Sequence, residues 1–284
     1  MYEHHFIRTN GITLHTVMAG PDGGPAVLLL HGFPEFWFGW RHQIPALAAA
    51  GFRVWVPDQR GYNLSDRPRG TAAYRLETLA QDALGLIEAT GQEHVYLAGH
   101  DWGAMVAWWV AQVAPERLRH LAILNVPHPH VARRHLLTDP RQMIRSTYAA
   151  FFQLPWLPEA LLGASNWRAL ARALENSSRP GTFSDDDLGK YRQAWSKPGA
   201  MTAMLNWYRA EARQPSGARP PHRLTVPTTI LWGKRDPALR SVMAEESAAL
   251  CERGELIWLP ENTHWVQHEA AAQVNEVLLR RFAE

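Results

Sequence analysis

Short runs of apolar residues recur along the chain, and glycine, proline or other turn-forming residues bound each of them. Runs of this length and character predict β-strands that are buried in a sheet. The expected strands are Phe6–Thr9, Ile12–Val17, Val27–Leu30, Arg53–Val56, Val95–Ala98, Leu121–Leu124, Thr228–Leu231 and Leu256–Leu259.

Between many of these runs, apolar residues recur every three or four positions, which predicts helices. The clearest helical segments are Leu76–Ala89, Trp102–Val113, Ser241–Cys251 and Val266–Phe282. Strands that alternate with helices of this length predict an α/β fold with a mainly parallel sheet, right-handed crossovers and helices on both faces. The first two runs are expected as an antiparallel meander at the sheet edge.

One region interrupts the alternation of strands and helices. From about His128 to Pro221 the sequence is rich in tryptophan, proline and arginine, has helical spacing, and contains no convincing buried strand before Thr228. We therefore expect a helical lid inserted after the sixth of eight strands. The predicted organisation is a core over residues 1–127, a lid over 128–222, and the rest of the core over 223–284.

The composition is that of a globular protein with its own core, since 46% of the 284 residues are hydrophobic and 20% are charged. A formal net charge of +2, with scattered lysine and arginine, favours neither nucleic acid nor an acidic membrane surface as a partner. Cys251 is the only cysteine, so no intrachain disulfide is possible. No leader pattern or run of roughly 18 apolar residues is present, which predicts a cytoplasmic protein without a membrane span. A monomer and a dimer are both compatible with these properties.

The segment from Val95 to Gly103 has the pattern of a strand, a sharp turn and a helix. Its turn has the G-x-nucleophile-x-G form of a nucleophile elbow, in which small residues let a strained turn present one side chain above the sheet. Here that side chain is the carboxylate of Asp101. The alternative is that Asp101 only caps the following helix, because aspartate is a favoured N-cap residue.

Two further residues follow strands in the order that this elbow requires. Asp236 comes just after Thr228–Leu231, and His264 comes on the loop after Leu256–Leu259. Open α/β sheets place their sites at the carboxyl ends of the strands, and nucleophile, acid, histidine is the chain order of this kind of site. By itself, each could be a turn former or a solvated loop residue, but three such residues in order favour a catalytic site.

A fourth part of the expected site is His31-Gly32-Phe33-Pro34-Glu35, directly after the strand Val27–Leu30. A strand followed by His-Gly at this point supplies one backbone N–H of an oxyanion hole, and the residue after the nucleophile supplies the other. These donors are the backbone amides of Phe33 and Trp102.

With these motifs, the chain resembles the epoxide hydrolase branch of the α/β-hydrolase family along essentially its whole length. The matching segments are HGFPE from His31, GHDWG from Gly99, WGKRD from Trp232, THW from Thr263, and two lid stretches, STYAAFFQLPW from Ser146 and LNWYR from Leu205. The resemblance implies that the lid stretches carry two ring-opening tyrosines, which by position are Tyr148 and Tyr208.

Helical spacing gives an independent but weaker argument for these tyrosines. Ile144, Tyr148 and Phe151 fall at i, i+4 and i+7, and Tyr208 has similar spacing from Met204, so both tyrosines are expected on inward faces of lid helices. Spacing alone favours core packing. In a lid, however, the inward face also roofs the active site.

A carboxylate nucleophile suits displacement at saturated carbon and leaves an alkyl ester on Asp101. His264, oriented by Asp236, would then activate water to hydrolyse the ester, and each oxyanion donor would contribute ~3–4 kcal/mol. An epoxide oxygen leaves as an alkoxide whose conjugate acid has a pKa near that of water, about 15.7. A tyrosine of ordinary pKa about 10 can protonate it. The pKa difference of roughly six units, at ~1.36 kcal/mol each, limits the stabilisation of the leaving oxygen to ~8 kcal/mol. The predicted partners are therefore a small apolar epoxide and water, with no cofactor.

Other functions fit the sequence less well. A haloalkane dehalogenase would use Asp101 and the Trp102 indole, but Phe33 stands where that family has a halide-binding asparagine. Fluoroacetate dehalogenases clamp their substrate with arginines where this chain has Trp102 and Met105. A non-catalytic ligand receptor would tolerate the loss of nucleophile, acid or base, yet all are present. A serine esterase is disfavoured by Asp101 itself.

Several other polar residues invite a functional interpretation. Three histidines cluster where the lid begins, at His128, His130 and His135. No carboxylate or thiolate stands at matching spacing, so turn and surface roles are favoured over a metal site. Asp58 precedes the nucleophile in the chain, which favours a loop-shaping role. Glu35 is a weaker candidate for orienting the surroundings of the hydrolytic water.

Overall fold

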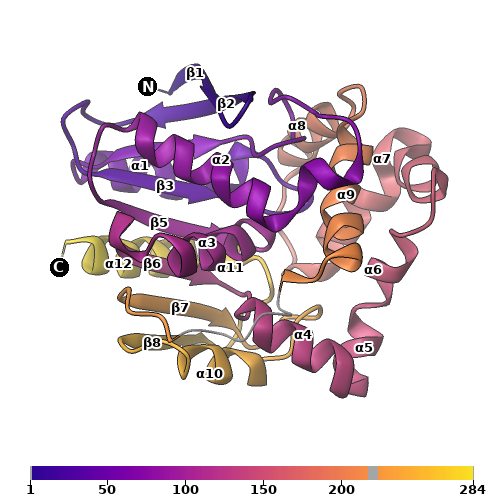
Figure 1. The fold of residues 1–284 in the computed structure, drawn as a ribbon. Coiled ribbons are helices and arrows are strands. Elements are labelled where there is room, and N and C mark those ends of the chain that lie inside the picture. Colours follow the sequence, from indigo (N-terminus) through magenta and orange to yellow (C-terminus); the bar gives the residue numbers. More distant parts are fainter. Residues whose placement is uncertain (1, 217–222, 284) are drawn as a thin grey trace.

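The computed structural model describes residues 2–216 and 223–283 (Figure 1). In this part of the chain, eight strands form one sheet in the order β1-β2-β4-β3-β5-β6-β7-β8. β2 pairs antiparallel with β1 and β4, and the remaining neighbours are parallel. The predicted fold class and edge meander are confirmed. The strands are β1 (Glu3–Thr9), β2 (Ile12–Ala19), β3 (Ala26–Leu30), β4 (Arg53–Pro57), β5 (Val95–His100), β6 (Leu118–Leu124), β7 (Thr228–Gly233) and β8 (Gly254–Leu259).

Helices cover both faces of the sheet, which explains why the central strand β3 is apolar at every position. Val27 and Leu29 of β3 face the side of α1 and α12, while Leu28 and Leu30 face the side of α2 and α3. The core helices are η1 (Trp37–Trp40), α1 (Gln43–Ala49), η2 (Thr71–Tyr74), α2 (Leu76–Ala89), α3 (Trp102–Val113), η3 (Pro115–Arg117), α10 (Val242–Ala248), α11 (Val266–Glu269) and α12 (Ala271–Phe282).

Two predicted helices differ from the structure. The segment Val266–Phe282 is not one helix, because Ala270 has φ −123° and ψ 36° and separates α11 from α12. The segment Ser241–Cys251 is helical only over α10, since Cys251 leaves the helix and forms an isolated parallel bridge with Leu224. In both places tertiary contacts end a helix that apolar spacing alone would continue.

The lid helices lie between β6 and β7 and gather beyond one end of the sheet, at the right of Figure 1. Within residues 128–216 all regular elements are helical, as the sequence predicts. The predicted end of the lid at residue 222, with Pro220 and Pro221, lies outside the described residues. The lid helices are α4 (Pro129–Thr138), α5 (Pro140–Arg145), α6 (Thr147–Phe151), α7 (Leu157–Ser177), α8 (Asp185–Trp195) and α9 (Ala200–Arg213).

Three of the lid helices begin at residues whose side chains accept a hydrogen bond from the first turn. His128 caps α4, Asp139 caps α5, and Ser184 forms a capping box with Asp187 at the start of α8. Such caps satisfy backbone N–H groups that have no partner inside the helix. Among the described helices, none has the length and apolarity that crossing a membrane requires.

Candidate active site

Asp101 stands at the turn between β5 and α3 with φ 50° and ψ −126°, a strained conformation for a residue with a side chain. Glycines make room for this turn. A Cβ on Gly103 would lie 2.1 Å from the Leu30 carbonyl oxygen, and one on Gly32 would lie 2.2 Å from the Asp101 Cβ. The Asp101 side chain makes no capping hydrogen bond to α3, so the capping alternative does not describe it.

The two carboxylate oxygens of Asp101 have different surroundings. Oδ1 accepts a hydrogen bond of 2.6 Å from the backbone N–H of Phe33, while Oδ2 faces His264 Nε2 at 3.5 Å. The side chain remains 18% exposed, so a small molecule can reach it. Burial by itself would raise the pKa of this carboxyl, but the hydrogen bond and charge of His264 outweigh burial and lower the pKa. Asp101 is therefore ionised at neutral pH.

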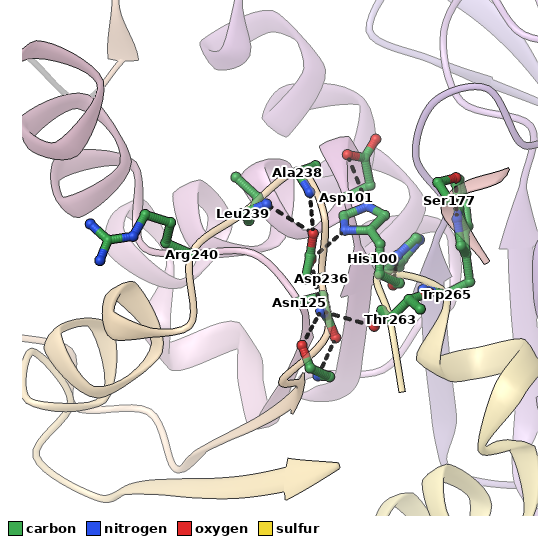
Figure 2. A network of polar contacts seen from close by, with 12 residues as sticks. His100, Asp101, Asn125, Ser177, Asp236, Ala238, Leu239, Arg240, Thr263 and Trp265 are labelled. Atoms are coloured by element: carbon green, nitrogen blue, oxygen red, sulfur yellow. Dashed lines mark hydrogen bonds and ion pairs between the residues drawn. The ribbon is translucent and has the colours of Figure 1, made fainter. Parts of the chain in front are cut away.

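Asp236 holds the other side of the His264 ring. Its Oδ2 lies 2.8 Å from His264 Nδ1, and its Oδ1 accepts hydrogen bonds of 2.7 and 2.8 Å from the amides of Ala238 and Leu239 (Figure 2). Burial alone would lower the pKa of His264, but the two carboxylates on either side raise it to about 10. The three residues that the sequence places on separate strand ends thus form one line of polar contacts.

Asn125 belongs to the same cluster, although the sequence argument did not identify it. It follows β6 with φ 52°, donates 2.8 Å to Asp236 Oδ2 and accepts 2.9 Å from the Gly233 amide (Figure 2). The sequence feature that could have identified Asn125 is its place directly after a buried strand, at the sheet edge where the other site residues lie. Asparagine is a residue that tolerates this left-handed conformation.

Tyr148 on α6 and Tyr208 on α9 come together above the elbow. Their ring centroids lie 6.0 Å apart, and the Tyr208 ring lies 5.0 Å from that of Trp102 and 5.4 Å from that of Phe33, both edge-on. Tyr208 is buried, whereas Tyr148 is 40% exposed. Burial raises the pKa of both hydroxyls, assisted by the charge of Asp101 at Tyr148 and by Tyr148 and then Asp101 at Tyr208, so both are protonated. Trp102 is the first residue of α3, where backbone N–H groups have no partner within the helix.

The predicted inward face of the lid is wrong at Ile144, which is 71% exposed. The periodicity fails because α5 ends at Arg145 and α6 begins at Thr147, so Ile144 and Tyr148 do not lie on one helix. Tyr148 instead packs against the Phe152 ring at 5.6 Å.

The other polar residues considered from sequence have contacts away from Asp101. His128 Nδ1 accepts from the His130 amide at 3.2 Å, and His135 lies between Asp139 and Glu246 at 3.2 and 2.7 Å. Asp58 accepts from His15, Trp37 and Asn63 and ties the loop after β4 together. Across the described residues, no group of three metal-binding side chains is arranged to hold an ion.

Comparison with known proteins identifies the family to which the chain belongs. Residues 25–271 match the family described as alpha/beta hydrolase fold. The chain is 48% identical over 274 residues to the AB hydrolase superfamily protein YfhM of Bacillus subtilis, covering 96% of each protein. It is 36% identical over 280 residues to Epoxide hydrolase 4 of Mus musculus, covering 96% of this chain and 77% of that protein.

The fold has equally extensive counterparts among solved structures. The crystal structure of an epoxide hydrolase from Bacillus megaterium in complex with an inhibitor matches with a TM-score of 0.89 and 30% identity, covering 99% of this chain and 100% of that one. Sequence and fold agree along nearly the whole length of the chain. This protein therefore belongs to the epoxide hydrolase branch of the α/β-hydrolase fold family and is a hydrolase.

Proposed function

We propose that this protein hydrolyses epoxides to vicinal diols through a covalent alkyl ester on Asp101. The observation that carries the proposal is the asymmetry of the Asp101 carboxylate. Oδ1 is held by the Phe33 amide at 2.6 Å, whereas Oδ2 has a longer contact, of 3.5 Å, with His264 Nε2. The more weakly held oxygen of an ionised carboxylate is the one suited to attack a saturated carbon.

In the first half-reaction, Asp101 Oδ2 attacks a ring carbon of the epoxide, and the C–O bond of the ring breaks. A hydroxyl of Tyr148 or Tyr208 gives its proton to the departing oxygen, so the product is a hydroxyalkyl ester on Asp101. The lowered pKa of Asp101 keeps the nucleophile ionised, and the raised pKa values of the two tyrosines keep their hydroxyls protonated. Each group is thus in the protonation state that this step requires.

Alkylation then changes the electrostatics around His264. Asp101 loses its charge on becoming an ester, so one of the two carboxylates that raise the pKa of His264 is neutralised. The pKa of His264 falls as a result, so the ring gives its proton to the tyrosinate that ring opening left and can then accept a proton from water. Asp236 holds Nδ1, which leaves Nε2 as the basic atom.

In the second half-reaction, water gives a proton to His264 Nε2 and adds to the ester carbonyl carbon. The negative charge develops on Oδ1, which the Phe33 amide already contacts at 2.6 Å, with the Trp102 amide as the second donor. The tetrahedral species then breaks its bond to the alkyl oxygen, which takes the proton from His264. Diol leaves, and Asp101, now a carboxylic acid, gives its remaining proton to His264, which restores the ionised pair of the free enzyme.

The haloalkane dehalogenase alternative is disfavoured by the surroundings of Trp102. Its indole packs edge-on against Tyr208 at 5.0 Å, and Phe33 offers a ring where a halide would need a second donor. The aromatic rings around the site instead suit an apolar epoxide, and aryl substituents could pack against them.

The proposal is tested with purified protein and a panel of aryl and alkyl epoxides and haloalkanes, measuring diol and halide release. Asp101→Ala should abolish diol formation. Asp22→Ala, a change at an aspartate that is 93% exposed, should leave diol formation unchanged. His264→Gln should trap the alkyl ester, detected as an intact-mass increase equal to the epoxide. Halide release without diol, or diol formation that survives Asp101→Ala, would overturn the proposal.

A further inference from the structure

The carboxylate of Glu35 is fully buried, yet the reaction sequence above does not use it. It accepts hydrogen bonds from the Tyr191 hydroxyl at 2.6 Å, from His268 Nε2 at 2.7 Å and from Gln267 Nε2 at 3.0 Å. Burial alone would raise the pKa of Glu35, but the charges and hydrogen bonds of His268 and His100 hold it well below the ordinary value, so the group is ionised. A buried carboxylate that loses a hydrogen-bond donor is strongly destabilised, so the donors around Glu35 are held in one arrangement.

One of these donors, Tyr191, comes from the lid, and the backbone of Glu35 contacts the peptide group that carries the Phe33 N–H. Tyr191 lies on α8, whereas the Glu35 amide donates to the Gly32 carbonyl oxygen at 2.8 Å. That carbonyl belongs to the same peptide group as the Phe33 N–H, which donates to Asp101 Oδ1. Because a peptide group is planar, a bond at its oxygen fixes the direction of its N–H.

A second contact from α8 secures the same loop. The indole N–H of Trp195 donates to the Pro34 carbonyl oxygen at 2.6 Å, and both residues of α8 that contact the loop are buried. Gly39 lies behind Glu35, where a Cβ would be 2.8 Å from Oε1, so the carboxylate has little room to move. The loop from Gly32 to Glu35 is therefore held between the lid and the core.

We propose that Tyr191 is a positioning residue for the hydrolytic half-reaction, because through Glu35 it fixes the Gly32–Phe33 peptide group whose N–H stabilises the oxyanion on Asp101. The inference rests on the function proposed above. Its consequence is that a lid helix, by way of a buried carboxylate, sets the geometry of a donor in the core.

The two half-reactions should respond differently to a displaced Phe33 amide. In the alkylation step, Asp101 loses negative charge, so a weaker donor to Oδ1 does not raise the barrier. In the hydrolytic step, Oδ1 gains a full charge, and the misplaced donor is felt in the transition state. Tyr191→Phe should therefore slow hydrolysis of the ester about tenfold, which corresponds to ~1.4 kcal/mol, and leave alkylation unchanged.

The experiment uses the full-length protein and single-turnover kinetics with an aryl epoxide. Alkylation is followed by tryptophan fluorescence, and ester hydrolysis by rapid quench and intact mass. Tyr74→Phe is the matched control, since it removes a buried tyrosine hydrogen bond of 2.8 Å, to Pro68, away from Glu35. Trp195→Phe is a second variant that removes the other α8 contact and should show the same selective loss.

The expected result is a lower kcat with unchanged kcat/KM for Tyr191→Phe and for Trp195→Phe, with accumulated ester, and no change for Tyr74→Phe. The pH midpoint of hydrolysis should stay where it is in the wild type. A shifted midpoint would instead place the effect on His264, whose carbonyl accepts from His100 at 2.9 Å, and would overturn the inference. So would equal losses in both half-reactions, or none. If the wild type forms no ester at all, it is the proposed function that fails.

Discussion

Asp236→Asn tests whether Asp236 orients His264 for ester hydrolysis, because the substitution keeps the size of the side chain and removes its charge. In the wild type, Oδ2 faces two donors at 2.8 Å, His264 Nδ1 and Asn125 Nδ2, while Oδ1 faces the amides of Ala238 and Leu239. An amide has one oxygen for these two pairs of donors. Whichever way it turns, one pair loses its acceptor.

The two backbone amides cannot move without breaking the loop, so we expect the asparagine oxygen to stay with them. Its NH2 group then faces His264, and the ring must carry its proton on Nε2 instead of Nδ1. In that tautomer, Nε2 has no lone pair for the water. The corresponding change in a serine protease triad lowers kcat about 10⁴-fold, and we expect ester hydrolysis to fall roughly 10³–10⁴-fold, or ~4–5.5 kcal/mol.

Alkylation should be much less affected, since Asp101 and both tyrosines are untouched. The assay mixes enzyme with a single equivalent of epoxide and follows the ester by intact mass over time. Glu261→Gln, at an exposed carboxylate on the same loop as His264, is the control and should behave as the wild type. If Asp236→Asn hydrolyses its ester within tenfold of the wild-type rate, Asp236 does not orient His264 and the reasoning is wrong.

Three further predictions follow from the lid, the ion pair and the start of α4. Tyr148→Phe and Tyr208→Phe should each slow alkylation by an epoxide by about 10²-fold or more, as expected for loss of a general acid; any haloalkane turnover, which needs no proton, should be spared, and equal losses for both substrates would contradict this. In a pH series, kcat should fall on acidification, because His264 of the ester form becomes protonated. The value of kcat/KM should stay level over about pH 5 to 8, because the Asp101–His264 pair remains charged in the free enzyme. Parallel pH profiles of kcat and kcat/KM would contradict this prediction. His128→Asn keeps a favoured N-cap and removes a group whose pKa burial lowers from 6.5 to about 4. Protons then bind the unfolded wild type preferentially, so between pH 7 and 4 it should lose roughly 3 kcal/mol more of its free energy of unfolding than the variant does; equal losses in urea titrations would refute this.

The sequence by itself determined the α/β fold and the places where chemistry was to be expected. Apolar runs bounded by turn residues are local signals, and they predicted every strand of the described sheet and a helical region between β6 and β7. Asp101, Asp236 and His264 were found because each follows a strand, and strand ends of a parallel sheet share one edge. Gly99, Gly32 and Gly103 mark the elbow, since a side chain at any of them would collide with backbone or with Asp101.

Only the tertiary structure decided how side chains from distant segments meet. Asn125 joins Asp236 across a separation of 111 residues, and Tyr191 joins Glu35 across 156, and neither pairing leaves a local pattern in the chain. The helix break before Thr147 likewise turned Ile144 outward against its spacing. Helical and strand periodicity report which face of an element is buried, whereas hydrogen-bond partners depend on distances of a few tenths of an ångström between elements. Those distances exist only once the layers and the lid have packed together.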